Sequence, residues 1–211
     1  MSKTQEMDFS NDSATPQRGE ARRRQILEAA SECFCQCGFH GASMDQIAKK
    51  AEMSVGHIYH YFKNKEAIIA AIVEQDLQHR LQNISIIQAD SEDGDIFAGM
   101  IARIDKGLDD LFNPSRTALR LECLAEATRT PQVAEMVQNA DKISRERWTE
   151  VRDQGRTARQ LGTDPYREVR TEVLGAIFEG LIVRSVLNPD VDRKKMADFL
   201  RRVVMRILET D

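Results

Sequence analysis

Several features are scarce in this chain of 211 residues. It has four cysteines and five prolines, and only 6% of its residues are aromatic. No apolar run reaches the roughly 20 residues that a membrane-spanning helix needs, and the first residues lack the basic start and apolar stretch of a secretion signal. The cysteines, three of them bunched at 33, 35 and 37, are too few for a secreted domain held together by disulfides. We therefore expect a cytoplasmic protein without a membrane partner.

Motifs of catalysis and cofactor binding are missing as well. The sequence has no Gly-x-Gly-x-x-Gly, no phosphate-binding loop, no nucleophile elbow and no His-Glu-x-x-His. Cys33, Cys35 and Cys37 alternate along a predicted helix, so Cys35 points away from the other two and the three cannot share a zinc ion. We expect no enzymatic activity, no cofactor and no metal site. Helix packing explains the cysteines best, and a thiol sensor is the alternative.

The apolar residues that are present recur with the period of helices. No segment alternates in the manner of a β-strand, and the prolines stand where helices begin or end. We predict an all-α fold of about nine helices, with boundaries good to a few residues. They cover approximately residues 19–37, 44–51, 55–61, 64–88, 95–112, 116–129, 131–157, 165–187 and 191–209.

Charge and composition divide the chain into three parts. A polar tail covers residues 1–17, a basic region 18–69 and a larger acidic region 70–211. From Arg18 to Lys65 there are eight Lys or Arg and five Asp or Glu, whereas the whole chain has a net charge of −4. Local charge governs attraction to a polyanion, so the basic region is the candidate for nucleic-acid binding.

Residues 43–65 of the basic region have the pattern of two short helices joined by a tight turn. Ser43 and Gln46 form a capping-box pattern, and Ser54 is a second candidate cap. Such a pair of helices meets at a steep angle, which is the helix-turn-helix arrangement. We predict that Tyr59 and Phe62 pack in the core, and that DNA is contacted by Ser43, Ser54, Val55, Gly56, His57, His60, Tyr61, Lys65 and Arg22.

These residues also carry a family resemblance. Ser43, Ile47, Ala48, Ala51, Ser54, Gly56, Tyr59, Tyr61, Phe62 and Lys65 stand at the spacing of the DNA-binding signature of the TetR family of one-component repressors. The stretch "ILEAASECFCQCGF" at 26–39 is similar to that family's first helix, and the resemblance covers approximately residues 22–69. Glu52 replaces the glycine usual in the turn, which costs roughly 1 kcal/mol if the backbone there is left-handed.

The resemblance implies a ligand-binding and dimerisation domain over residues 70–211. Its last two helices are expected to pair with those of a second chain, and the candidate dimer contacts are Val173, Ile177, Leu181, Phe199, Val203 and Ile207. A cavity for a small-molecule effector of unknown identity is expected, lined by Phe97, Met100, Ile104, Phe112, Glu122, Trp148 and Phe178. Arg103, Glu126 and Glu179 are further polar candidates, and the acidic residues mildly favour a cationic or aromatic effector.

The expected function is therefore a repressor that binds a palindromic operator in double-stranded DNA as a homodimer and is released by its effector. The alternative is a DNA-binding regulator without an effector pocket, switched by cysteine oxidation or by a protein partner.

Overall fold

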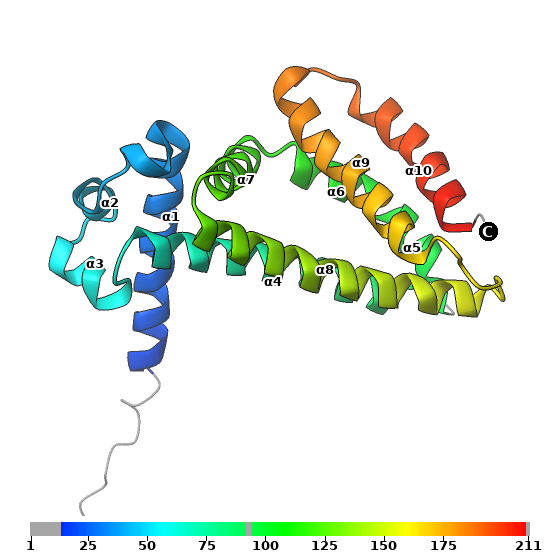
Figure 1. The fold of residues 1–211 in the computed structure, drawn as a ribbon, viewed down its shortest axis with the longest axis horizontal. Helices are drawn as coiled ribbons and strands as arrows, with labels where there is room; N and C mark the ends of the chain where they lie inside the picture. The colour runs from blue at the N-terminus through cyan, green and yellow to red at the C-terminus, as the bar shows by residue number, and fades with distance from the viewer. Residues whose placement is uncertain (1–13, 92–93, 210–211) are drawn as a thin grey trace, which may run out of the picture. The chain divides into compact units, whose positions relative to one another are not determined.

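The computed structural model describes residues 14–91 and 94–209 of the chain, and within these ranges every regular element is a helix (Figure 1). The all-α prediction is confirmed, although this part of the chain contains ten helices instead of nine. Most of the predicted polar tail lies outside the described residues, and the first helix already begins at Ala14. The chain forms two compact units, Met1–Ile68 and Ile69–Asp211.

The first unit contains α1 (Ala14–Gly41), α2 (Met44–Lys50), α3 (Val55–Tyr61) and the start of α4 (Lys65–Ala89). Its core is built mainly from residues three or four apart on each helix, which places them on one face. The largest fully buried side chains of the unit are those of Ile26, Phe34, Ile47, Ile58 and Ile68. α1 was expected to end at residue 37, but it continues to Gly41 past a kink at Gly38, where φ is 74°.

Side-chain caps fix both helices of the helix-turn-helix. Ser43 Oγ accepts from the Gln46 N–H, and the Gln46 side chain accepts from the Ser43 N–H, so the predicted capping box is confirmed. Ser54 Oγ accepts from the His57 N–H at the start of α3. In the turn between the helices Glu52 has a φ of 53°, the left-handed conformation that usually selects glycine.

The second unit is made of the rest of α4 and six further helices. These are α5 (Ile96–Ala102), α6 (Ile104–Leu111), α7 (Pro114–Ala127), α8 (Pro131–Ala158), α9 (Arg167–Leu187) and α10 (Arg193–Glu209). Pro114 and Pro131 stand in the first turns of α7 and α8, where their missing N–H costs no helical hydrogen bond. α8 packs against α5, α7 and α9, and α10 packs against α5, α6, α8 and α9.

The extra helix arises because the segment predicted as one helix over 95–112 is broken at Arg103. Arg103 has a φ of −93° and a ψ of 3°, and its N–H bonds to the Met100 carbonyl three residues back. Its guanidinium bonds to Asp90 at 3.0 Å. α5 and α6 can therefore follow different directions, and both contribute to one core cluster with α10.

A close approach of α5 and α8 depends on Gly155. A Cβ added at this glycine would lie 2.5 Å from the Phe97 ring, closer than real side chains come. Phe97 is fully buried here, with the Arg159 guanidinium 5.1 Å from its ring centre. This packing leaves Phe97 in the core of the unit.

Buried arginines hold the segment between α8 and α9. Arg156 donates to the Leu208 and Gly162 carbonyls, both at 3.0 Å, and Arg170 donates to the Ile207 carbonyl. Arg170 also forms a two-pronged bond with Asp164, whose side chain is only 3% exposed. These contacts attach the segment to the end of α10.

Candidate DNA-binding surface and effector cavity

The exposed face of α3 is the candidate DNA-binding surface. Gly56, His57 and His60 are exposed, and Val55 and Tyr61 are half-buried. Tyr59 is 51% exposed, so the prediction that it packs in the core is wrong, whereas Phe62 is buried as predicted. Ile58 and Phe62 are four residues apart and share the buried face, while Tyr59 lies about 100° further around the helix axis.

Aromatic and imidazole rings cluster at the carboxyl end of this face. The Tyr61 ring centre lies 5.5 Å from that of His57 and 5.2 Å from that of His60. At the amino end, the Ser54 hydroxyl uses its oxygen to accept from His57, which leaves its own hydrogen to donate. The same holds for Ser43 at the start of α2. These groups offer donors suited to phosphate oxygens.

Lys65 makes intramolecular contacts that the sequence did not predict. Its Nζ donates to the Phe39 and Ala42 carbonyls, both at 2.7 Å, and lies 4.7 Å from the Phe39 ring centre. The kink at Gly38 leaves these carbonyls outside a regular helix, so Lys65 caps the end of α1 from the first turn of α4. The predicted phosphate contact of Lys65 stays a prediction.

Two other cations of this unit are better exposed. Lys63 lies between α3 and α4, is exposed, and has no ion-pair or hydrogen-bond partner in the described part of the chain. Arg22 is exposed and donates to Gln25, whose side chain donates in turn to the Ala51 carbonyl beside the turn. Lys63 was not among the predicted contacts, although a lysine between two short helices of a basic region is a common exposed position.

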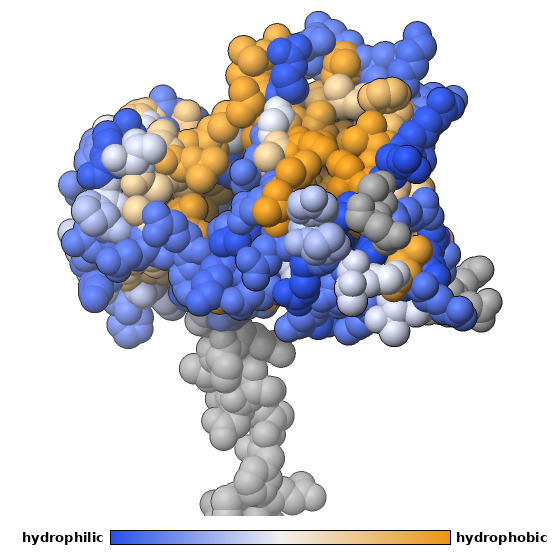
Figure 2. Space-filling view, turned by 45° about the vertical axis from the view of Figure 1, so that its right-hand side comes forward, coloured by the Kyte–Doolittle hydropathy of each residue, from blue (hydrophilic) through white to orange (hydrophobic). Residues whose placement is uncertain are grey.

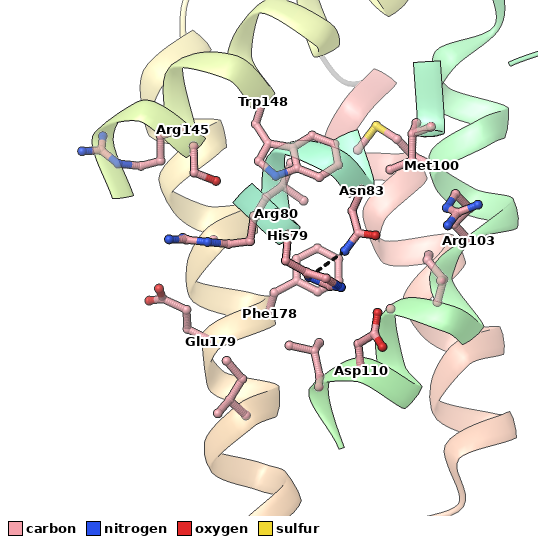
Figure 3. A pocket seen from close by; sticks show the side chains of 18 of the residues that line it. His79, Arg80, Asn83, Met100, Arg103, Asp110, Arg145, Trp148, Phe178 and Glu179 are labelled. Atoms are coloured by element: carbon pink, nitrogen blue, oxygen red, sulfur yellow. Dashed lines mark hydrogen bonds between the residues drawn. The ribbon is translucent and has the colours of Figure 1, made fainter. Parts of the chain in front are cut away.

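The second unit contains a cavity of about 330 Å³, within the size range of small-molecule sites. α4 contributes His79, Arg80 and Asn83, which were not among the predicted residues (Figure 3). Three polar residues on one helix face, next to the buried Ile84 and Ile87, were the signal that could have identified them.

Four of the seven predicted cavity residues line it: Met100, Ile104, Trp148 and Phe178. Phe97 and Phe112 do not, because both are buried in the core cluster shared with α10, and Glu122 lies outside the lining. Of the further polar candidates, Arg103 and Glu179 line the cavity and Glu126 does not. Apolar character could not separate core residues from cavity residues, since both are enclosed.

His79 lies in the middle of a polar group in the cavity. Its Nδ1 is 3.2 Å from the Asn83 side-chain amide, and its Nε2 is 3.2 Å from Arg116 Nη1. Burial, and after it the charge of Arg116, lowers the pKa of His79 below its usual value. Both effects favour the neutral form of the imidazole.

An apolar stripe runs along the exposed face of α9. Spacings of four and three residues separate its members, and all six are exposed: Val169, Val173, Ala176, Gly180, Val183 and Leu187. Figure 2 shows apolar side chains gathered on the surface of the unit that contains this helix. Of the predicted dimer residues, Val173 and Phe199 are exposed, the latter by 68%, while Ile177, Leu181, Val203 and Ile207 are half-buried.

The cysteines do not form a site in the described ranges. Cys33 is buried, which raises the pKa of its thiol, and its carbonyl accepts from the Cys37 Sγ at 3.0 Å. No group of three or more His, Cys, Asp or Glu side chains within residues 14–91 and 94–209 is arranged to hold a metal ion. In the same ranges, no helix has the length and apolar character to cross a membrane.

Comparison with known proteins agrees with this arrangement. The family model of bacterial regulatory proteins, tetR family, matches residues 26–72, and that of the C-terminal part of BetI-type transcriptional repressors matches residues 102–209. The HTH-type transcriptional regulator UidR of Escherichia coli K12 is 39% identical over 118 residues, which are 56% of this chain and 57% of UidR. That match thus spans little more than half of the relative's length.

Solved structures share the fold over nearly the whole chain. GusR of Salmonella enterica superposes with a TM-score of 0.77 and 28% identity, covering 90% of this chain and 96% of GusR. A SmeT–triclosan complex superposes with a TM-score of 0.73 and 23% identity, covering 89% and 90% of the two chains. The latter likeness concerns the fold alone.

The fold and the exposed helix-turn-helix define a DNA-binding transcriptional regulator, and not an enzyme. The chain belongs to the TetR family of bacterial regulatory proteins.

Proposed function

We propose that the chain is a repressor that binds an inverted-repeat operator as a homodimer and leaves it when a small molecule occupies the cavity. The observation that carries this proposal is the course of α4. This single helix starts at Lys65, beside the end of α1, and supplies His79, Arg80 and Asn83 to the cavity wall. A ligand that moves those three residues moves α4, and the first turn of α4 is hydrogen-bonded to the end of α1 through Lys65.

The DNA-contacting groups in this proposal lie at the two ends of α3. Val55, Gly56 and His57 enter the major groove at its amino end, where a side chain beyond glycine at position 56 would meet open space. Tyr59, His60 and Tyr61, together with Ser43, Ser54, Lys63 and Arg22, donate to backbone phosphates. Lys65 is the least favoured of the predicted DNA contacts, because its ammonium already donates hydrogen bonds to the Phe39 and Ala42 carbonyls.

Dimerisation through α9 and α10 is supported by the exposed apolar stripe. Alternating steps of three and four residues are the spacing by which two helices interlock side chains along a seam. Gly180 lies in the middle of the stripe, and a Cβ added there meets nothing within 4 Å in the chain. A second chain can therefore approach closely at this point. Two copies of the chain then present two α3 helices to an inverted repeat.

Gly180→Leu tests this dimer. The leucine fits the isolated chain, so the helix content should stay unchanged while light scattering shows monomers at low micromolar concentration. Lys142→Leu, at an exposed position of α8, is the matched control and should leave the dimer intact. A Gly180→Leu chain that remains dimeric would contradict the proposed interface.

Effector release is tested with duplexes selected from a random pool by the purified protein. A library of metabolites and drugs is screened for compounds that raise the melting temperature, and each hit is added to the protein–duplex complex. Hits should lower DNA affinity by at least about fivefold, since coupling free energies are typically about 1–3 kcal/mol. Hits that leave DNA affinity unchanged would reject the repressor mechanism.

The alternative, a regulator switched by cysteine oxidation or by a protein partner, would use the exposed Cys35 or Cys37 if a thiol is the switch. Cys33 is buried and its thiol has a raised pKa, which makes it a poor nucleophile at neutral pH. Loss of DNA binding on peroxide treatment that is abolished by Cys35→Ser would favour the alternative.

A further inference from the structure

The charge of the cavity wall is unevenly distributed. Seven of its side chains are Arg or Lys and four are Asp or Glu. Some of the cations have carboxylate partners outside the lining: Arg103 pairs with Asp90 at 3.0 Å, and Arg145 pairs with Glu172 at 2.7 Å. The positive excess is therefore concentrated elsewhere in the wall.

Two pairs of the remaining cations each share one carboxylate oxygen: Lys106 and Arg116 share Asp110 Oδ1, at 3.4 and 3.6 Å, and Arg80 and Arg120 share Asp76 Oδ2. Asp76 Oδ2 lies 3.2 Å from Arg80 Nε and 3.1 Å from Arg120 Nη1. Arg120 has a second partner in Glu179 at 3.2 Å, whereas Arg80 has no other carboxylate partner in the described part of the chain. Both guanidiniums also line a neighbouring hollow of about 380 Å³. Arg80 thus lines both hollows with a single carboxylate partner within 4 Å, which it shares with Arg120.

The rest of the lining suits a ring or another apolar body. Trp148, Phe178 and Met100 line the cavity together with His79 and Asn83 (Figure 3). Of the acidic residues that suggested a cationic effector, Glu122 and Glu126 line neither hollow, whereas Glu179 lines both and is paired with Arg120. The four carboxylates that line the cavity all have cationic partners, so a cationic ligand would have to displace one of these partners.

We propose that the cavity binds a small organic anion whose acidic group pairs with the Arg80 guanidinium and whose ring packs against Trp148 and Phe178. A guanidinium and a carboxylate or sulfonate form parallel hydrogen bonds that are stronger in a partly buried site than in water. This inference names the class of ligand for the proposed effector cavity and rests on that proposal.

A pair of fluorescent probes with one scaffold tests the charge requirement. 1-Anilinonaphthalene-8-sulfonate carries a sulfonate, and N-phenyl-1-naphthylamine is the same ring system without it. Titrated into the full chain, the sulfonate should bind at one saturable site per chain at least about tenfold more tightly than the neutral amine, as expected for one charge-assisted pair. Equal affinities, tighter binding of the neutral probe, or no saturable site for the sulfonate would overturn the proposal.

Three variants locate the effect. Arg80→Gln should remove the difference between the two probes, and the fold should persist because Asp76 keeps its bond to Arg120. Lys142→Gln removes an equal charge from an exposed position outside the cavity and should change nothing. Asp76→Asn should bind the sulfonate several-fold more tightly at one saturable site while its circular dichroism and urea midpoint stay unchanged, because a loosened fold also binds this dye. An unchanged affinity in Arg80→Gln would refute the assignment.

Failure of this inference is distinguishable from failure of the repressor mechanism. The probe titrations contain no DNA and report only what the cavity binds. If the sulfonate binds as described but does not release a selected duplex, the ligand class stands and the release mechanism falls. If the neutral probe binds better and does release the duplex, the release mechanism stands and the proposed ligand class falls.

Discussion

Replacement of Lys65 by methionine separates a structural contact from a DNA contact. The change keeps the length of the side chain and removes its ammonium, which donates two hydrogen bonds of 2.7 Å to the end of α1 and faces the Phe39 ring. Hydrogen bonds from charged groups contribute about 1.5–3 kcal/mol each when buried. Lys65 is half-buried, so about half of that value applies to each.

Together with about 0.5 kcal/mol from the contact with the Phe39 ring, the loss amounts to roughly 2–3.5 kcal/mol. Urea unfolding followed by circular dichroism should show this decrease, because α1 supplies much of the helix in the first unit. Trp148 is the only tryptophan and belongs to the second unit, so its fluorescence should report a smaller effect.

Lys63→Met is the matched control, since Lys63 is exposed and without a partner in the described residues. It should leave stability unchanged and reduce the slope of DNA affinity against salt concentration by about one, the effect of one lost phosphate contact. Lys65→Met should change this slope by clearly less than one. If Lys65→Met instead lowers the slope by one and leaves the free energy of unfolding unchanged, the contacts of Lys65 to α1 do not stabilise the first unit. Lys65 would then be a phosphate contact.

Three further predictions concern single side chains. Glu52→Gly should raise the free energy of unfolding by up to about 1 kcal/mol, because φ is 53° at this residue, and a less stable variant in urea would contradict this. Tyr59→Phe should weaken DNA binding about fivefold, the value of one hydrogen bond, without changing stability; unchanged affinity would remove Tyr59 from the contact surface. Burial acts to raise the pKa of Asp164. Hydrogen bonds from Arg170 and the Tyr166 N–H, together with the charges of Arg170 and Arg152, outweigh burial and lower the pKa in the folded state. Its stabilisation is therefore full above the pKa of an unfolded aspartate, about 3.9, and is lost as the pH falls through the lower folded value. Asp164→Asn should cost about 3–5 kcal/mol at pH 7 and progressively less in acid, and a cost independent of pH would refute the pairing.

Local signals in the sequence predicted the helix-turn-helix well. Ser43 and Ser54 each cap a helix as predicted, since a cap involves only residues two or three positions apart. Tyr59 was predicted to lie in the core because it is aromatic and follows the apolar Ile58. Its side chain points about 100° away from that of Ile58 around the axis of α3, and it is exposed.

Contacts between distant residues limited the prediction of the cavity. Whether Phe97 lines a hollow or fills a core depends on Gly155, 58 positions away, which allows its ring to be covered by α8. The roles of Arg80 and Arg120 likewise depend on a carboxylate that they share across α4 and α7. No periodicity within one helix contains this information.

The number of chains on a selected duplex tests the account most directly. Duplexes are selected from a random pool, the sequence of the bound site is determined, and the mass of the complex is measured by native mass spectrometry. We predict an inverted repeat that carries an even number of chains, and we expect Gly180→Leu to reduce the affinity for this repeat. A single, non-repeated site occupied by one chain would contradict the proposed dimeric repressor.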